Sequence, residues 1–267
     1  RFILIINICR VMEEVKIAIT GASGWVGKNL IVSLHKKMSK KAFRKNIFLY
    51  GSKNKELRLN TNLSNLRIRN LSEFYKDALK NNFHNIYHCA FIVREHIPRI
   101  GINKYIELNR NITNAVLEGI KQTKSSRLTV FSSGAASFHK KVVLKKDLEL
   151  DPYGALKREE EIKLSDNANT QIIRIYALTG KYIRNPNSFA ISNLLLQAKY
   201  ESKINLTANR SIKRGYINAK DLCNLSILIS NNKKLFNKIR YLNAVSDEIT
   251  LLELAKLISK KFDNKEI

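Results

Sequence analysis

A run of three glycines between an apolar strand and an amphipathic helix restricts the fold of this chain more than any other feature. Residues 15–20 read Val-Lys-Ile-Ala-Ile-Thr, and Gly21, Gly24 and Gly27 follow at intervals of three residues. Residues 26–38 then carry apolar side chains at helical spacing. A glycine turn between a strand and a helix is the context in which this spacing indicates phosphate binding. The sequence therefore predicts the first strand–turn–helix unit of a nucleotide-binding sheet.

Each glycine of this turn has a separate physical use. Gly21 permits the tight turn, Gly24 lets the backbone approach a pyrophosphate, and Gly27 lets the helix pack closely on the strand. The amino terminus of the helix stabilises the phosphate charge. We expect a bound dinucleotide to contact these residues of the turn: Gly21, Ser23, Gly24, Trp25, Val26 and Gly27.

Strand-length apolar runs alternate with helical patterns over the first two thirds of the chain. We expect strands at 15–20, 47–50, 66–69, 86–90, 128–132 and 172–175, and helices at 26–38, 71–80, 104–121 and 154–164. Continuously apolar strands between helices are typical of a parallel sheet that is covered on both faces. The pattern predicts an α/β fold with a doubly wound parallel sheet.

The regular alternation of strands and helices ends at about residue 176. After that point, helices expected at 191–200, 219–229 and 251–261 surround short extended segments. We expect residues 12–175 to form the nucleotide-binding domain. Residues 176–267 would form a small lobe on the carboxyl edge of the sheet, where open α/β sheets bind ligands. Residues 1–11 precede Met12, which we take as the natural start, so we expect them to be an upstream extension.

The charge of the chain suggests anionic ligands but does not identify them. Lys and Arg number 48 against 22 Asp and Glu, a formal net charge of +26, and 44% hydrophobic residues exclude a disordered polycation. Such a charge attracts nucleotide phosphates, RNA or acidic membrane surfaces. No basic motif interleaved with aromatic residues is present, so we expect no nucleic-acid binding. The lysine runs are expected to be solvated surface.

Cysteine and histidine usage argues against metal and disulfide chemistry. Cys9, Cys89 and Cys223 are widely separated and form no C-x-x-C pair, which fits a reducing, cytoplasmic compartment. The five histidines have no metal-ligand spacing, and His88 is expected to serve packing. No apolar run approaches the roughly 20 residues that span a bilayer. We expect no metal and no membrane span.

The end of the second strand bears on the choice of cofactor. An acid about twenty residues after the glycine turn holds the ribose 2′-hydroxyl of NAD. Here Ser52 and Lys53 stand after that strand, and Lys55 follows. Positive charge at this place suits the additional phosphate of NADP, although surface lysines are common in this chain. NADP is therefore favoured over NAD.

The pattern Tyr-x-x-x-Lys occurs twice, and its context separates the two copies. Tyr153 and Lys157 follow Asp151-Pro152 at a helix start, 20 residues after a strand that ends in Ser133. One helical turn separates this tyrosine from its lysine, so both lie on one face. Tyr216 and Lys220 have no serine-ended strand before them, and we expect that tyrosine to be structural.

The first copy has a coherent chemistry. A tyrosine ordinarily loses its proton near pH 10, so it is a poor base at neutrality. The Lys157 ammonium and the positive nicotinamide favour the phenolate and bring Tyr153 into working range. The Ser133 hydroxyl can hydrogen-bond the substrate oxygen on which charge develops. Tyr153 would then move the proton while a hydride passes between substrate and nicotinamide.

With these motifs in view, the chain resembles the extended short-chain dehydrogenase/reductase superfamily, in its NAD-dependent epimerase/dehydratase branch. The resemblance covers about residues 15–262. It is carried by TGASGWVG (20–27), YHCAF (87–91), LNRNITNAVLEG (108–119), FSSGAAS (131–137), DPYGALK (151–157), RIYALTG (174–180), RGYINAKD (214–221) and YLNAVSDEITLLELAKLI (241–258). Members mostly modify nucleotide-activated sugars.

This resemblance implies a Rossmann-type α/β fold with a small C-terminal substrate-binding lobe. It implies Ser133, Tyr153 and Lys157 as the catalytic residues. It further implies NAD or NADP contacts at these positions: Ser52, Lys53, Asn70, Leu71, Ala90, Asn109 and Lys157. A homodimer through helices 104–121 and 154–164, a cytoplasmic location and a setting in lipopolysaccharide or capsule sugar synthesis are implied in the same way.

Departures from the family pattern narrow the reaction. Dehydratases that form 4-keto-6-deoxy sugars carry Thr-Asp-Glu where this chain has Ser133-Gly134-Ala135, so 4,6-dehydration is disfavoured. Ser137-Phe138 replaces the family's Tyr-Gly and alters the substrate wall. The chain ends earlier than most members, so we expect a lobe that is incomplete or cut short.

Two classes of function remain open from the sequence. The first is a nucleotide-sugar epimerase or 4-keto reductase that uses NAD(P). The second is a non-catalytic NAD(P)-binding protein, either a redox sensor or an RNA-associated scaffold. The intact set of Ser133, Tyr153 and Lys157 favours the enzyme, because a scaffold needs no base.

Overall fold

The computed structural model of the 267-residue chain describes residues 12–59, 63, 65–123, 126–166, 169–206, 211–263 and 265–267. The extension expected at residues 1–11 lies outside the described residues. All element bounds below refer to these ranges.

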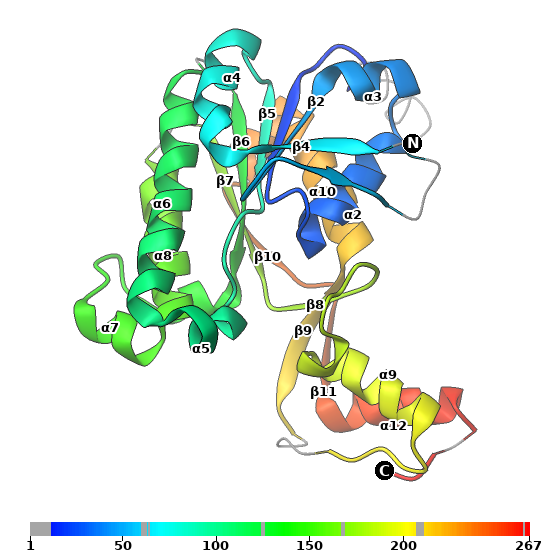
Figure 1. The fold of residues 1–267 in the computed structure, drawn as a ribbon. Helices are drawn as coiled ribbons and strands as arrows, with labels where there is room; N and C mark the ends of the chain where they lie inside the picture. The colour runs from blue at the N-terminus through cyan, green and yellow to red at the C-terminus, as the bar shows by residue number, and fades with distance from the viewer. Residues whose placement is uncertain are drawn as a thin grey trace.

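An eight-stranded sheet forms the centre of the described structure, in the order β10-β7-β6-β5-β1-β2-β4-β3 (Figure 1). Its strands are β1 (Ile17–Thr20), β2 (Ile47–Gly51), β3 (Lys55–Leu57), β4 (Leu66–Asn70), β5 (Asn85–His88), β6 (Arg127–Ser133), β7 (Thr170–Ile175) and β10 (Tyr241–Ala244). All pairs are parallel except β3 with β4, which is antiparallel. The predicted doubly wound α/β fold is confirmed, with one antiparallel strand at its edge.

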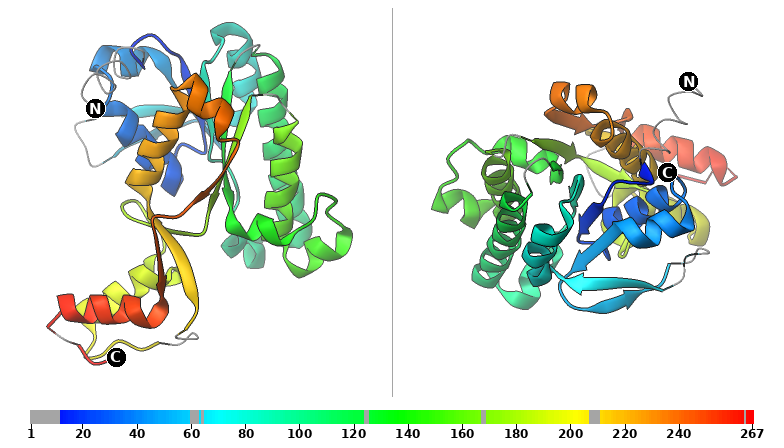
Figure 2. Two further views of the ribbon diagram at one scale, coloured as in Figure 1. Left: turned by 180° about the vertical axis from the view of Figure 1, so that it is seen from behind. Right: turned by 90° about the horizontal axis from the view of Figure 1, so that it is seen from above.

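Helices cover both faces of this sheet (Figure 1 and Figure 2). One face carries α2 (Trp25–His35), α3 (Lys40–Asn46) and α10 (Ala219–Ser230), and the other carries α4 (Phe74–Asn81), α6 (Ile102–Lys121) and α8 (Pro152–Ser165). Shorter elements connect them: η1 (Leu71–Glu73), η2 (Arg94–His96), α5 (Ile97–Ile100), η3 (Gly134–Phe138), α7 (Lys145–Leu150) and α11 (Lys233–Lys238).

Strand β1 shows why its first three residues are all apolar. Ile17 and Ile19 belong to the hydrophobic cluster that includes residues of α2 and α10. Ala18, between them, belongs to the cluster formed with α4, α6 and α8. Because successive side chains of a strand point to opposite faces, a strand covered on both sides needs apolar residues throughout.

A smaller lobe lies beyond the edge of the sheet near α5 and α7 (Figure 1). It contains a second sheet in the order β11-β9-β8 and two helices packed on each other. Its elements are β8 (Ala177–Thr179), η4 (Pro186–Ser188), α9 (Ala190–Tyr200), β9 (Lys213–Asn218), β11 (Asp247–Thr250) and α12 (Leu251–Lys261). Its core, which includes Leu194, Tyr216 and Leu254, is separate from the two cores of the main sheet.

The chain passes twice between the two sheets after residue 176. Helix α10 returns to pack against α2, and β10 adds to the main sheet beside β7. The lobe is therefore assembled from segments on either side of these two elements. One consequence is that the loop after β8 passes close to the glycine turn, where Arg184 donates a hydrogen bond to the Ser23 carbonyl oxygen.

Candidate active site

The glycine turn adopts the tight geometry that its sequence predicts. Gly21 has a φ of +68°, and a Cβ there would lie 2.6 Å from the backbone of Cys89 and Ala90. A Cβ on Gly27 would lie 2.4 Å from the Gly21 carbonyl oxygen. Both positions therefore exclude a side chain, because such contacts are far shorter than van der Waals distances. The turn thus packs directly on β5 and on its own helix.

The amino end of α2 is prepared for an anion. Gly24 caps the helix without a side-chain hydrogen bond, and its first turn contains no acidic residue. The first N–H groups of a helix have no partner within the helix and carry partial positive charge. An 11-residue helix whose amino end opens on a glycine turn therefore fits the pyrophosphate of a dinucleotide.

Three cations converge on this turn from different parts of the chain. The Lys55 Nζ atom donates to Ser23 Oγ at 3.0 Å, and Arg184 Nη2 donates to the Ser23 carbonyl oxygen at 3.0 Å. Lys28 lies one helical turn into α2, over the Tyr182 ring. Burial, Arg184 and Lys55 lower the pKa of Lys28, so the three charges are close enough to repel one another. A bound phosphate would relieve this repulsion.

The edge formed by β2 and β4 carries four residues that were expected to contact the cofactor: Ser52, Lys53, Asn70 and Leu71. Gly51 pairs with Asn70 across the two strands. The Asn70 backbone N–H donates to Asn54 Oδ1 at 2.7 Å, and its side-chain amide donates to the Ser52 carbonyl oxygen at 3.4 Å. Leu71 begins η1 directly after this edge. Lys53 is exposed here, whereas Lys55 reaches back to the glycine turn.

Ala90 and Asn109 lie at the loop that follows β5. Ala90 touches the glycine turn, as the contact at Gly21 shows. The Asn109 side chain is buried, accepts a hydrogen bond from the Ile92 N–H at 2.8 Å and donates to the Ile92 carbonyl oxygen at 3.2 Å. Asn109 thus fixes the loop after β5 to α6, next to the place expected for the cofactor.

Two of the residues predicted for catalysis, Ser133 and Lys157, lie at the carboxyl end of β6, and Tyr153 opens the helix that carries Lys157. Ser133 is the last residue of that strand, and its Oγ atom accepts from the Ala135 N–H at 3.2 Å. Asp151 caps α8 by accepting from the Gly154 N–H at 3.1 Å, which presents Tyr153 in the first turn. Lys157 Nζ donates to the Phe131 carbonyl oxygen at 3.1 Å.

Sequence reasoning missed two residues that contact this lysine. The Lys157 Nζ atom lies 3.9 Å from the centre of the Phe91 ring, and Phe91 also packs edge-on against Tyr153 at 5.7 Å. Glu160 accepts a hydrogen bond from Lys157 Nζ at 2.8 Å. A carboxylate three residues along a helix from a lysine normally signals an exposed ion pair. Only the burial of Glu160, which is 1% exposed, distinguishes it.

The second Tyr-x-x-x-Lys copy does not form a comparable pair. Tyr216 lies in β9 and packs in the core of the small lobe, whereas Lys220 lies exposed in α10. The break between strand and helix removes the one-turn spacing that the pair would need. The structural interpretation of Tyr216 is confirmed.

Glu161 ties α8 to the sheet through a buried network. It is fully buried and accepts hydrogen bonds from Arg174 Nε at 2.8 Å, Arg174 Nη2 at 2.7 Å, Arg158 Nη1 at 2.9 Å and Ser132 Oγ at 2.7 Å. Burial opposes ionisation, but these partners outweigh it and lower the pKa of Glu161. The helix that carries Tyr153 is thereby fixed on β6 and β7.

Replacing Glu161 by Ala is expected to lower the free energy of unfolding by about 3–5 kcal/mol, because two arginines lose their buried counterion. Urea unfolding measures this loss. The matched control is Glu159→Ala, which breaks the half-exposed pair with Arg110 and should cost about 1 kcal/mol or less. Equal losses in the two variants would contradict the structural role of Glu161.

The same carboxylate makes stability depend on pH in a defined direction. Because the pKa of Glu161 is lower in the folded than in the unfolded protein, its contribution is complete above the ordinary value of 4.5. The contribution is lost as the pH falls through the folded-state pKa. In Glu161→Gln, the free energy of unfolding should therefore fall less between neutral and acidic pH than in the wild type. Urea unfolding at a series of pH values measures this difference.

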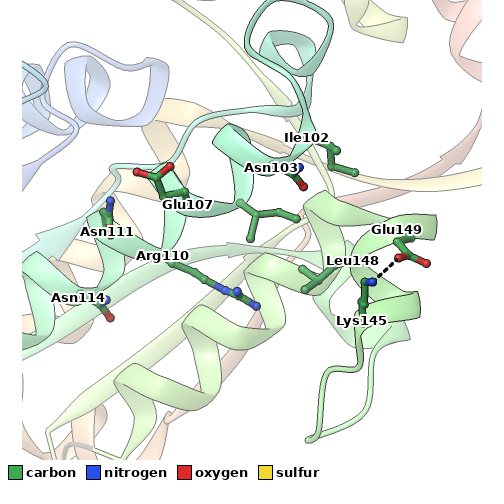
Figure 3. Close-up of a pocket in the computed structure, with 10 residues that line it drawn as sticks. Ile102, Asn103, Glu107, Arg110, Asn111, Asn114, Lys145, Leu148 and Glu149 are labelled. Atoms are coloured by element: carbon green, nitrogen blue, oxygen red, sulfur yellow. Dashed lines mark ion pairs between the residues drawn. The ribbon is translucent and has the colours of Figure 1, made fainter.

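The surface pocket drawn in Figure 3 lies away from these groups. It is formed between α6, which contributes Glu107, Arg110 and Asn114, and α7, which contributes the ion pair Lys145–Glu149. These side chains are polar and come from the outer surface of the helix layer. The pocket belongs to the helix face expected to contact a second copy of the chain, not to the candidate active site.

Two features are absent from the described part of the chain. No group of three or more His, Cys, Asp or Glu side chains in that part of the chain is placed to hold a metal ion. No helix within the described ranges has the length and apolar character needed to cross a membrane.

This chain is similar to known proteins both in sequence and in fold. The model of the NAD dependent epimerase/dehydratase family matches residues 17–242. A search of curated proteins finds no match. Solved structures with the same fold include an epimerase from the methanogen Methanothermobacter thermautotrophicus, with 19% identity over 99% of this chain and 82% of the other and a TM-score of 0.71.

Two further structures show how broad this fold is. The UDP-N-acetylglucosamine 4-epimerase from Bacillus cereus has 20% identity, covers 94% of this chain and 85% of its own, and has a TM-score of 0.67. L-threonine dehydrogenase from Clostridium difficile has 20% identity, with 93% and 81% covered and a TM-score of 0.72. The fold is therefore shared by proteins named for different substrates.

Proposed function

This chain belongs to the NAD dependent epimerase/dehydratase family, and from that premise we propose that it transfers a hydride on a nucleotide-activated sugar, as an epimerase or a 4-keto reductase. The proposal rests on the contacts that α8 makes with β6 and with the loop after β5. Lys157 contacts the Phe131 carbonyl oxygen and Phe91, and Phe91 contacts Tyr153. This cluster lies on the same sheet edge as the glycine turn.

The protein groups divide the chemistry among them. Tyr153 takes or returns the proton of the sugar hydroxyl, and the Lys157 ammonium stabilises the phenolate that forms. The Ser133 hydroxyl hydrogen-bonds the sugar oxygen as its charge changes. When bound, the nicotinamide supplies or accepts the hydride. Phe91 covers one side of the Lys157 ammonium, which limits water around it and strengthens its effect on the phenol.

The fit of the dinucleotide rests on the glycine turn. Gly21 and Gly27 leave no room for side chains, and the free amino end of α2 faces the turn. The Ser23 backbone and hydroxyl are the atoms that Arg184 and Lys55 contact. The lysines that follow β2, Lys53 and Lys55, support NADP over NAD as the proposed cofactor, because the 2′-phosphate adds charge that a lysine can pair.

A nucleotide sugar is proposed as the substrate on two grounds. The family is one of epimerases and dehydratases, and one solved structure of this fold is MoeE5 in complex with UDP-glucose and NAD, at 18% identity. The lobe built from β8, β9, β11, α9 and α12 lies beyond the edge of the sheet that carries the reacting groups. Open α/β sheets bind ligands in this region.

Conversion of candidate substrates tests the proposal. The protein, supplied with NADP(H) or NAD(H), is incubated with UDP-, GDP- and dTDP-linked sugars and their 4-keto forms, and products are resolved by chromatography and NMR. We expect one nucleotide sugar to be converted, and L-threonine to be inert. Oxidation of L-threonine, with every nucleotide sugar unchanged, would contradict the proposed substrate class.

Release of bound cofactor distinguishes the two proposed reactions. An epimerase oxidises and re-reduces its substrate, so denaturing the purified protein should release close to one dinucleotide per chain. A 4-keto reductase exchanges its cofactor in each turnover, so little should be released. The intact Ser133, Tyr153 and Lys157 set favours either of these over a non-catalytic redox sensor or RNA-associated scaffold.

Homodimerisation through α6 and α8 stays a prediction. Arg110 of α6 pairs with Glu159 of α8 through two hydrogen bonds of 2.9 and 2.7 Å, which holds the two helices together as one surface. A cytoplasmic location and a setting in cell-surface sugar synthesis likewise stay predictions.

A further inference from the structure

A buried chain of polar side chains connects β1 to the lysine of the candidate active site. Thr20 Oγ1 lies 2.6 Å from His88 Nδ1, His88 Nε2 lies 3.0 Å from Glu160 Oε1, and Glu160 Oε2 accepts from Lys157 Nζ at 2.8 Å. All four residues are at most 5% exposed. Burying a carboxylate in a helix–sheet contact is costly unless it is paired, and an apolar residue would pack there more simply. Glu160 therefore calls for an explanation other than packing.

The neighbouring carboxylate shows the contrast. Glu161 faces Arg158 and Arg174 and binds α8 to β7, which is sufficient to fix the helix. Glu160 points to a different side and contacts the lysine that the proposed reaction uses. Burial opposes its ionisation, but Lys157 and His88 outweigh burial and keep the pKa of Glu160 below its ordinary value. Glu160 is thus a carboxylate at neutral pH.

The contacts of Lys157 Nζ determine how many of its hydrogen-bond donors are left for other groups. An ammonium has three donors, and two of them are used by the Phe131 carbonyl oxygen and Glu160. The aromatic face of Phe91 lies 3.9 Å from Nζ on another side. One donor is therefore left for a ligand or for Tyr153, and Glu160 determines its direction.

The charge of Glu160 acts in the opposite sense to that of Lys157. A positive charge near a phenol favours the phenolate, and a negative charge near that positive charge weakens the effect. We propose that Glu160 is a positioning residue that holds the Lys157 ammonium against the Phe131 carbonyl oxygen and weakens the electrostatic effect of Lys157 on Tyr153. Tyr153 then retains its proton to a higher pH than the lysine alone would allow. This inference deepens the proposed function and rests on Tyr153 being its acid and base.

Other titratable groups surround this pair, and all of them stay in place in the variants below. His88 and Cys89 from the β5 side are near Lys157 and Glu160. Arg94 of η2 lies over the Tyr153 ring, and Tyr105 of α6 is near Tyr153, Glu95 and Asp151. Burial raises the pKa of the Cys89 thiol and of Tyr105, so both are neutral near pH 7. Glu160→Gln also changes the partner of His88, whose Nε2 lies 3.0 Å from Glu160 Oε1, and it leaves the other groups unaltered.

The test is a pH titration of Tyr153 itself, which needs neither substrate nor cofactor. Protein labelled with ¹³Cζ-tyrosine is followed by NMR, and the Tyr153 signal is assigned by its loss in Tyr153→Phe. Glu160→Gln keeps the shape of the side chain and removes its charge. We expect the titration midpoint of Tyr153 to fall by about one pH unit in this variant.

Two controls separate charge from packing. Glu159→Gln removes a carboxylate of the same helix that faces Arg110, and it should leave the midpoint unchanged. Glu160→Asp retains the charge and should keep the midpoint within a few tenths of wild type. A midpoint that moves equally in Glu159→Gln and Glu160→Gln, or that rises in Glu160→Gln, would overturn the inference.

A second comparison serves if Glu160→Gln does not fold. Lys157→Gln and the double variant Lys157→Gln/Glu160→Gln differ only in the Glu160 charge, and the double variant contains no unpaired charge from this pair. The midpoint should be lower in the double variant, and equal midpoints would contradict the inference. If Tyr153 responds in this way yet proves dispensable for turnover, the proposed function fails while the positioning role of Glu160 stands.

Discussion

Tyr153→Phe is expected to lower kcat by about 10²–10⁴-fold, the range that a positioned general acid or base contributes. The variant removes one oxygen and keeps the aromatic ring. The edge-on contact with Phe91 and the neighbouring Arg94 guanidinium, 5.9 Å from the ring centre, therefore remain. Only the proton transfer is lost. Initial rates on the nucleotide sugar identified by the conversion assay measure the effect.

The controls for this variant use the same chemical change elsewhere. Tyr75→Phe alters an exposed tyrosine of α4, far from the sheet edge that carries Ser133, and should leave kcat unchanged. Dinucleotide affinity should be retained in Tyr153→Phe, because the glycine turn is not altered. A Tyr153→Phe enzyme with wild-type turnover would remove Tyr153 from the mechanism.

Lys55→Ala is expected to weaken NADPH binding by about ten- to a hundredfold, since a hydrogen bond between charged groups contributes about 1.5–3 kcal/mol. NADH lacks the 2′-phosphate, so its affinity should change little. The reason for choosing Lys55 is structural: its Nζ atom lies against Ser23 in the turn, 3.0 Å from Oγ. Isothermal titration calorimetry gives both affinities.

Lys53→Ala is the comparison for the cofactor prediction. Lys53 stands two residues before Lys55 and is also expected to contact the cofactor, but it is exposed. Its removal should therefore weaken NADPH binding less than Lys55→Ala does. Equal losses of NADPH and NADH affinity in Lys55→Ala would show that Lys55 pairs the pyrophosphate, and a larger effect in Lys53→Ala would contradict the assignment.

Local patterns in the sequence were sufficient for the framework of the fold. The apolar run at residues 17–20, the glycine turn and the helix after it are each encoded within a few residues, so they could be predicted. The same is true of Tyr153, because Asp151 and Pro152 mark the helix start in the sequence. Strands β3 and β10 were not predicted, since three or four residues with mixed polarity give no periodic signal.

Contacts between distant segments account for what the sequence did not disclose. Lys53 and Lys55 are equivalent in sequence, and only the antiparallel turn into β3 brings Lys55 to Ser23. Arg184 comes from a loop 161 residues after the same serine. His88 was expected to serve packing alone, yet it hydrogen-bonds Glu160 of α8. A carboxylate in a helix is normally solvated, so its burial could not be read from the sequence.

Binding of a dinucleotide by the glycine turn beside Tyr153 can be tested optically. Trp25 is the only tryptophan of the chain and opens α2 within this turn. Titration with NADPH and with NADH, after any bound cofactor has been removed, should quench Trp25 emission saturably and excite the reduced nicotinamide by energy transfer. NADPH should saturate at the lower concentration. No saturable change with either dinucleotide up to about 1 mM, the upper end of usual working affinities, would contradict the account.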